Sequence, residues 1–218
     1  MLAELGCWDT LLDDAEPIRE MIVTDSRTGD PTRPVFLTFD GEVRPGEPFA
    51  HMLPNAALNG ALRDICGACG VTISQGVAVS GFSEDAPGAP LTVTLTNGEE
   101  VKARLLIAAD GVNSPTARTL FGTAFDRARI GFALEVEHPG ADPDRPLRID
   151  FGAADWGYGW QFPKADSTTI GIGDLHARNP DMRRDMQRYL KNLGIADAPK
   201  VKGQYLPFGF ARAKPGKA

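Results

Sequence analysis

The segment RLLIAADGVNSPTAR, residues 104–118, constrains the fold of this chain more than any other stretch. Its apolar run LLIAA, residues 105–109, is the pattern of a parallel β-strand that is buried on both faces. Asp110 ends the run and would lie at the carboxyl end of that strand. Because open α/β sheets bind ligands at this edge, the segment predicts part of an α/β sheet with an acid beside a ligand site.

The residues after this run carry the signals of a tight turn and a helix. Gly111 permits backbone conformations that a side chain would block. Asn113 or Ser114 can cap a helix whose first residue is Pro115. A polar turn without a ligand has the same signals, since Asp-Gly is common in turns. The residues alone leave the two interpretations open.

Composition and charge exclude several classes of protein. The chain has 218 residues, 42% of them hydrophobic and 24% charged, which is typical of a globular protein. Its net charge is −6 with scattered basic residues, so we expect no nucleic-acid partner. No apolar run is long enough for a membrane span, and the first residues lack a secretory signal. These features predict a cytoplasmic chain.

The three cysteines do not indicate a metal site. Cys66 and Cys69 form a CGAC motif at the end of a predicted helix, whereas redox dithiols usually begin one. A structural zinc site needs four ligands, and no second pair is present in the sequence. We therefore expect no metal, no disulfide and two cysteines packed in the helix.

Hydrophobic periodicity predicts two groups of elements. A helix follows Asn55, with apolar residues on one face, and Asn97-Gly98 predicts a hairpin. A later helix would have Asn179 as its N-cap and Pro180 as its first residue. The predicted extended segments, several of which are expected to pair antiparallel, are residues 18–25, 34–40, 71–74, 77–82, 91–96, 130–136, 147–151, 158–162, 168–172 and 201–210.

The sequence ADGVNSPTAR resembles the Asp-Gly fingerprint of the p-hydroxybenzoate hydroxylase-like superfamily of FAD-dependent oxidoreductases. The resemblance implies that Asp110 and Gly111 lie against FAD and that Arg118 is the arginine that ends the motif. A carboxylate can accept a hydrogen bond from a ribose hydroxyl, and a helix N-terminus favours a phosphate. FAD is therefore the expected cofactor, with NAD(P)H as the electron donor of the parent enzyme.

The two halves of the chain resemble different branches of that superfamily. The first half, around AEPIREMIVTDSRTGDPTRPVFLTFDGEV, resembles the aromatic hydroxylases of ubiquinone biosynthesis. The second half resembles the geranylgeranyl reductases, whose YxWxFP signature is matched by Tyr158, Trp160, Phe162 and Pro163. The resemblance does not separate a natural chain from an artificial splice.

The expected fold is α/β, or mixed α+β, with a partial FAD-binding lobe and an antiparallel substrate-binding sheet. Residues 51–122 would form the FAD lobe, and residues 1–50 with 123–218 the substrate lobe. The glycine-rich GxGxxG motif and the GDAAG-like segment of the superfamily are absent from the sequence. We therefore expect an internal fragment that retains FAD weakly or not at all.

Other candidate residues have a structural and a functional interpretation. Val79 aligns with a strand residue near the adenine, and His51 and Asn55 with polar residues near the flavin, although Asn55 can simply cap a helix. Tyr158, Trp160 and Phe162 alternate and share one strand face. They would cover the later helix, line a substrate pocket, or do both.

The resemblance implies hydroxylation of a prenylated aromatic compound, such as a ubiquinone precursor. Prenyl reduction is the alternative, and a remnant without catalytic activity is a third hypothesis, because the dinucleotide-binding motif is absent. No catalytic acid or base is assigned, since a flavin carries the redox chemistry itself. The expected partner is a prenylated or aromatic small molecule, and such a lipophilic substrate would allow peripheral contact with a membrane. The sequence does not indicate an oligomeric state.

Overall fold

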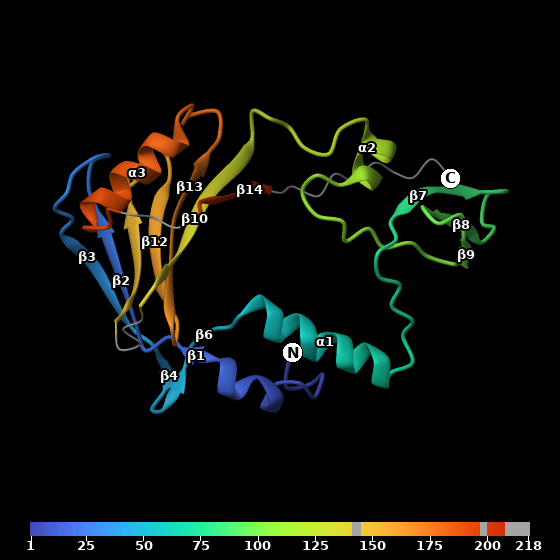
Figure 1. Ribbon diagram of the computed structural model, residues 1–218, viewed down its shortest axis with the longest axis horizontal. Helices are drawn as coiled ribbons and strands as arrows, with labels where there is room; N and C mark the ends of the chain where they lie inside the picture. The colour runs from blue at the N-terminus through green and yellow to red at the C-terminus, as the bar shows by residue number, and fades with distance from the viewer. Residues whose placement is uncertain (141–144, 197–199, 208–218) are drawn as a thin grey trace. The chain divides into compact units, whose positions relative to one another are not determined.

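The chain forms two compact units (Figure 1). The computed structural model describes residues 1–140, 145–196 and 200–207. Within these ranges the first unit holds residues 1–61 and 125–207, and the second holds residues 62–124. The predicted α/β class with a mostly antiparallel sheet is confirmed. Among the described residues, none of the helices has the length and apolar character needed to cross a membrane.

A seven-stranded sheet is the centre of the first unit. Its strand order is β14-β10-β13-β12-β11-β2-β3, and every neighbouring pair is antiparallel except β11 and β2, which are parallel. The strands are β2 (Glu20–Asp25), β3 (Val35–Asp40), β10 (Ile130–Pro139), β11 (Leu147–Phe151), β12 (Tyr158–Pro163), β13 (Ser167–Leu175) and β14 (Lys202–Pro207). Short elements complete this unit: the 3₁₀ helix η1 (Asp9–Asp14), β1 (Glu16–Pro17), β4 (Glu42–Arg44), β5 (Glu47–Pro48) and β6 (His51–Met52).

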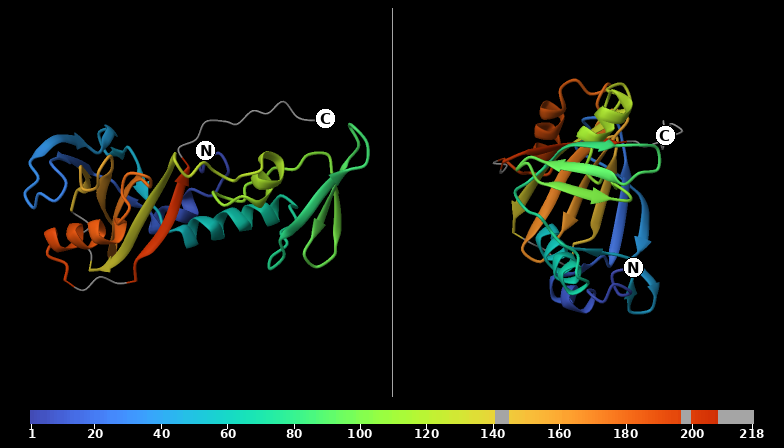
Figure 2. Two further views of the ribbon diagram at one scale, coloured as in Figure 1. Left: turned by 90° about the horizontal axis from the view of Figure 1, so that it is seen from above. Right: turned by 90° about the vertical axis from the view of Figure 1, so that its right-hand side faces the viewer.

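Helix α3 (Met182–Asn192) covers one face of this sheet, as Figures 1 and 2 show. Its apolar side chains recur at helical spacing and pack on alternate residues of β10 and β13. The buried cluster that results consists of Leu134, Val136, Ala153, Ile170, Ile172, Met182, Met186, Tyr189 and Leu190. The predicted N-cap is wrong by two residues, because Asp181 caps α3 and accepts a hydrogen bond from the Arg184 amide. Asn179 instead binds the backbone of Asp155: its side-chain Oδ1 accepts a hydrogen bond from the Asp155 amide, and its Nδ2 donates one to the Asp155 carbonyl oxygen.

The second unit has a three-stranded antiparallel sheet and a short helix. The strands are β7 (Val79–Glu84), β8 (Leu91–Leu95) and β9 (Glu100–Ala103), and the helix is α2 (Pro115–Phe121). The predicted hairpin at Asn97-Gly98 joins β8 to β9, with Gly98 at a φ of +85°. Residues 71–74, which were predicted to be extended, form no strand.

Helix α1 (Asn55–Ala68) spans the boundary in sequence between the two units. The helix predicted after Asn55 is confirmed, although none of its residues is fully buried. Cys66 is half-buried, but Cys69 is exposed and so is not a packed residue as predicted. All three cysteines are free, and no metal-binding cluster occurs within the described ranges.

The prediction of a buried strand at residues 105–109 is wrong. These residues have no regular structure, and Leu105 and Ile107 are 72% and 78% exposed. A strand is stable only when another strand satisfies its backbone groups, and none of the described strands pairs with this stretch. The apolar run therefore lies in solvent, although its composition is typical of a core strand.

One acid of the first unit is buried without a hydrogen bond. Asp174, near the end of β13, is 4% exposed, and neither of its carboxylate oxygens has a partner among the described residues. Burial, followed by the charges of Asp185 on α3 and of Asp155 after β11, raises the pKa of Asp174 to about 7. A neutral Asp174 is therefore the form that this packing favours.

We predict that the free energy of unfolding falls as the pH rises from about 4 to about 7. In this range the folded chain keeps the proton of Asp174, whereas the unfolded chain releases it, so each step up in pH favours the unfolded state. Urea unfolding at several pH values measures the effect, and Asp174→Asn should remove most of the decline. Asp13→Asn, at an exposed acid, should keep it. An unchanged decline in Asp174→Asn would contradict the assignment.

Candidate functional site

The Asp-Gly turn of the second unit is held by local hydrogen bonds. Asp110 is exposed, and its Oδ2 accepts a hydrogen bond from the Thr116 amide at 3.2 Å. The hydroxyl of Ser114, together with Thr116, holds the pKa of Asp110 below its ordinary value. Gly111 has a φ of +78°, the left-handed conformation that favours glycine. The turn therefore presents an ionised carboxylate to solvent, where it can accept a hydrogen bond from a hydroxyl group.

The start of helix α2 is capped from within the chain. Ser114 is the N-cap and accepts a hydrogen bond from the Ala117 amide at 2.8 Å, with Pro115 next, which confirms the predicted start of the helix. Asp110 and Ser114 together use the amides of Thr116 and Ala117. These two donors are not free for a phosphate, so the expectation that this N-terminus binds one is not supported by the geometry.

Two further predicted cofactor residues lie in this unit. The guanidinium of Arg118 donates a hydrogen bond to the Asn113 carbonyl oxygen at 2.8 Å, so it stiffens the loop between Gly111 and the helix. Val79 begins β7 and is 45% exposed. The role of Val79 near adenine stays a prediction.

His51 and Asn55, the other two predicted cofactor residues, lie in the first unit. His51 is in β6, and its ring meets that of Trp8 edge to face at 5.0 Å between centroids. Asn55 is the first residue of α1. Both positions have a structural explanation, and their contact with a flavin also stays a prediction.

Tyr158, Trp160 and Phe162 form a continuous row of aromatic rings on β12. Their ring centroids are 5.8 and 6.0 Å apart along the strand, and Phe151 of β11 extends the row with a centroid 6.1 Å from that of Tyr158. We call these four residues the aromatic row. They face away from α3, because the alternate residue Gly159 lies against Tyr189 of that helix. The interpretation that these rings cover the later helix is therefore wrong.

Two glycines make room for the central ring of this row. Trp160 is opposite Gly171 in the β12–β13 pair, and Tyr158 is opposite Gly173. A Cβ at Gly171 would overlap the Trp160 indole, and one at Gly173 would lie 3.2 Å from it. The indole is therefore packed over the backbone of β13, which leaves Trp160 only 7% exposed beside the more exposed Tyr158.

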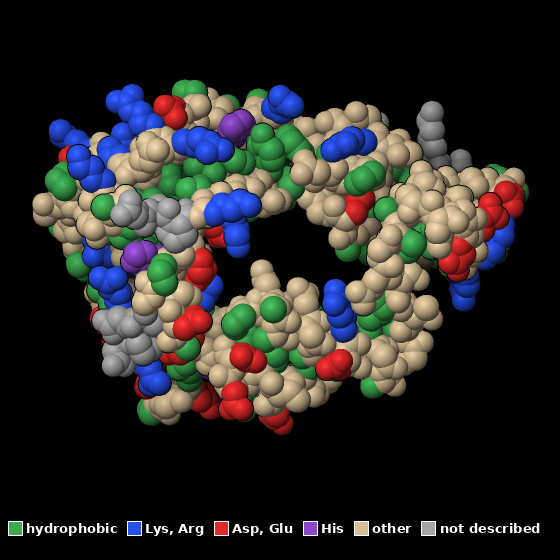
Figure 3. Space-filling view, in the orientation of Figure 1, with side chains coloured by type: hydrophobic (Ala, Val, Ile, Leu, Met, Phe, Trp, Pro, Cys, Tyr) green, Lys and Arg blue, Asp and Glu red, His purple; other side chains and the backbone are tan. Residues whose placement is uncertain are grey.

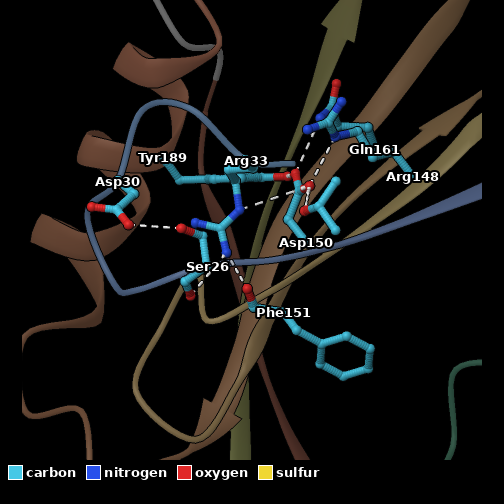
Figure 4. A network of polar contacts seen from close by, with 9 residues as sticks. Ser26, Asp30, Arg33, Arg148, Asp150, Phe151, Gln161 and Tyr189 are labelled. Carbon is cyan, nitrogen blue, oxygen red and sulfur yellow. Dashed lines mark hydrogen bonds and ion pairs between the residues drawn. The ribbon is translucent and has the colours of Figure 1, made fainter. Parts of the chain in front are cut away.

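A polar network on the opposite face joins the strands that carry the aromatic row (Figure 4). Asp150 of β11 is fully buried and accepts hydrogen bonds from Tyr189 at 2.6 Å, Arg148 at 2.8 Å and Gln161 at 3.4 Å, and from Thr24. The Arg33 guanidinium is 3.9 Å from the same carboxylate. Burial opposes ionisation, but the hydrogen bonds outweigh it and hold the pKa of Asp150 below its ordinary value.

This network fixes the strands beneath the aromatic rings. Asp150 is next to Phe151 on β11, and Gln161 lies between Trp160 and Phe162 on β12. Sequence reasoning missed Asp150, Gly171 and Gly173. The only sequence signal for the glycines is their spacing of two within a strand that otherwise reads as buried, which indicates close approach of another group.

We predict that Gly171→Ala lowers the free energy of unfolding by about 1–3 kcal/mol, since the new methyl group overlaps the Trp160 ring and the Leu134 carbonyl oxygen. The near-ultraviolet circular dichroism of the tryptophans should change as well. The control is Gly81→Ala, because no atom lies within 4 Å of a Cβ there. Equal stability of the two variants would show that the indole does not depend on Gly171.

We predict that Asp150→Asn costs about 3 kcal/mol of stability, because it leaves the buried guanidinium of Arg33 and the half-buried one of Arg148 without their counter-charge. Chemical denaturation measures this loss. Glu137→Gln is the matched control: Glu137 also accepts hydrogen bonds from three side chains, but it is 42% exposed and should lose less than about 1 kcal/mol. A similar small loss in both variants would mean that Asp150 does not hold the sheet together.

Sequence comparison assigns the first part of the chain to a known family. Residues 1–131, more than half of the chain, match the FAD binding domain family. Menaquinone reductase of Mycobacterium tuberculosis is 30% identical over 203 residues, covering 79% of this chain and 48% of that protein. Ubiquinone hydroxylase UbiL of Rhodospirillum rubrum is 29% identical over 115 residues, covering 52% of this chain and 25% of that protein. The chain thus spans half or less of the length of these relatives.

Solved structures show the same fold at low sequence identity. A geranylgeranyl bacteriochlorophyll reductase-like protein from Thermoplasma acidophilum superposes with a TM-score of 0.71 at 18% identity, covering 88% of this chain and 50% of that one. The flavin-dependent halogenase CmlS superposes with a TM-score of 0.65 at 17% identity, covering 94% and 40%. These likenesses concern the fold, and the family match over residues 1–131 agrees with the Asp-Gly motif in pointing to FAD: the chain belongs to the FAD binding domain family.

Proposed function

We propose that this chain is part of an FAD-dependent oxidoreductase that acts on a prenylated quinone or a related prenylated aromatic compound. The observation that carries the proposal is the aromatic row on the open face of the sheet, where Tyr158 and Phe151 are 39% and 47% exposed. Such a surface suits a flat ring or an unsaturated tail, since ligand sites are mostly apolar and aromatic. The names of the two relatives, menaquinone reductase and ubiquinone hydroxylase, each include a quinone and support this substrate class.

The Asp110 turn is the part of this chain that fits the cofactor best. FAD, when bound, supplies the electron transfer, with NAD(P)H proposed as the source of electrons. The residues of the chain contribute recognition: the ionised Asp110 carboxylate accepts a hydrogen bond from a hydroxyl of the cofactor, and Arg118 keeps the loop in place. Gly111 has no atom within 4 Å of the position of a Cβ, so a ligand can approach the backbone there.

The lengths of the two sequence matches favour reduction of the substrate over hydroxylation. The menaquinone reductase matches 79% of the chain, and the ubiquinone hydroxylase matches 52%. Hydroxylation is kept as the second candidate, because the first half of the sequence carries that resemblance. The two reactions differ in their product, which gains two hydrogens in the first case and one oxygen in the second.

The test is an assay of the chain with excess FAD, NAD(P)H and menaquinone in detergent micelles, with mass spectrometry of the product. A gain of two hydrogens supports reduction, and a gain of one oxygen supports hydroxylation instead. Tyr158→Ala should raise KM about tenfold through lost aromatic contact. Phe36→Ala, at an exposed ring outside the aromatic row, should not change KM. FAD binding without turnover of the quinone would favour the remnant hypothesis and contradict the proposal.

We predict that Asp110→Ala weakens FAD binding about tenfold or more, because a hydrogen bond to a charged group contributes about 1.5–3 kcal/mol. Titration of FAD fluorescence with the chain measures the dissociation constant. Asp85→Ala is the control, since the exposed Asp85 pairs with the exposed Lys102 and its loss should leave the affinity unchanged. If the two variants bind FAD equally, Asp110 is only a turn residue.

A further inference from the structure

An apolar groove lies beside helix α3, on the face of the sheet opposite the aromatic row. Its volume is about 600 Å³. Small-molecule sites typically have volumes of roughly 300–1,000 Å³. Its apolar lining comes from Leu134, Met186, Leu190, Ile195, Ala196 and Val201. Leu134, Met186 and Leu190 belong to the buried core and form its floor, whereas Val201 is 37% exposed. The groove can therefore hold an apolar chain against a rigid surface.

The polar rim of this groove is cationic. Arg183, Gln187 and Lys191 are spaced by four residues and so follow one line along α3. Arg183 and Lys191 are exposed, and neither forms an ion pair within the part of the chain that the structure describes. Among the described residues that line the groove none is an acid, although the chain as a whole carries a net charge of −6. Figure 3 shows Lys and Arg side chains gathered over the region of α3, beside hydrophobic side chains.

These two properties select one kind of ligand. An apolar lining favours a hydrocarbon chain, and unpaired cations along one edge favour an anionic group next to that chain. A ligand in the groove would also be separated by the sheet from anything bound to the aromatic row, since Leu134 and Tyr158 lie on opposite faces. The groove is therefore distinct from the proposed substrate surface.

We propose that this groove docks an anionic phospholipid of a bilayer, with an acyl chain over Leu134 and Val201 and the phosphate against Arg183 and Lys191. The contact attaches the first unit to the membrane surface without a spanning helix. Each cation near an anionic surface strengthens binding about fivefold, so the two together contribute more than tenfold. The electrostatic part weakens as salt is added.

The test is sedimentation of the full chain with vesicles of phosphatidylcholine, with and without phosphatidylglycerol. We expect binding that requires phosphatidylglycerol and falls with salt, and a loss of at least about tenfold in the double variant Arg183→Glu, Lys191→Glu. Val201→Asp should also weaken binding, by removing the apolar contact. The control is Arg44→Glu with Arg129→Glu, which changes the net charge equally at exposed cations away from the groove. Circular dichroism verifies that all variants are folded.

Four outcomes would overturn the proposal. They are no binding to either vesicle, equal binding to both, retained binding in the Arg183 and Lys191 variant, and an equal loss in the control variant. A fifth outcome separates the lipid site from the proposed function, and it requires vesicles with added menaquinone. If binding needs menaquinone in the vesicle and disappears in Tyr158→Ala, the contact belongs to the aromatic row. If the chain does not turn over the quinone but still binds the vesicles as expected, the lipid site is supported and only the proposed function is contradicted.

Discussion

The buried carboxylate of Asp150 joins more elements of the first unit than any other polar group described above. It accepts hydrogen bonds from β2, β11, β12 and α3, through Thr24, Arg148, Gln161 and Tyr189. Removing a charge from water costs several kcal/mol, and only a complete set of partners offsets that cost. A shift of any one of these elements would leave the carboxylate short of a partner. The network therefore selects one register for the strands and one position for the helix.

The two faces of the sheet have different roles because side chains alternate along a strand. On one face Asp150 and Gln161 meet the polar network, while Ile170 and Ile172 pack against α3. The other face is left for the aromatic row. Gly171 and Gly173 remove side chains where the Trp160 indole lies, so the ring is fixed by backbone below and by its neighbours on β12. A rigid aromatic surface of this kind loses little entropy when it binds a flat ligand.

The sequence predicted the features that depend on a few neighbouring residues. The cap at Ser114, the hairpin at Asn97-Gly98 and the alternation of Tyr158, Trp160 and Phe162 are confirmed, because each is determined within a short stretch. The partners of Asp150 lie up to 126 residues away in sequence, and no local pattern identifies them. The strand predicted at residues 105–109 fails for the same reason. Its apolar composition is visible in the sequence, but the pairing that would bury it depends on other segments.

The Asp110 turn keeps its shape although residues 105–109 form no strand. Its hydrogen bonds reach no further than six residues along the chain: Asp110 bonds Thr116, and Arg118 bonds the backbone of Asn113. Forming a binding site costs conformational entropy for every residue that must be ordered, and a turn that is already ordered avoids that cost. The exposed apolar run before it would still have to be fixed when a cofactor binds. In the proposed function the acid supplies recognition, and the affinity for FAD would then depend on what orders residues 105–109.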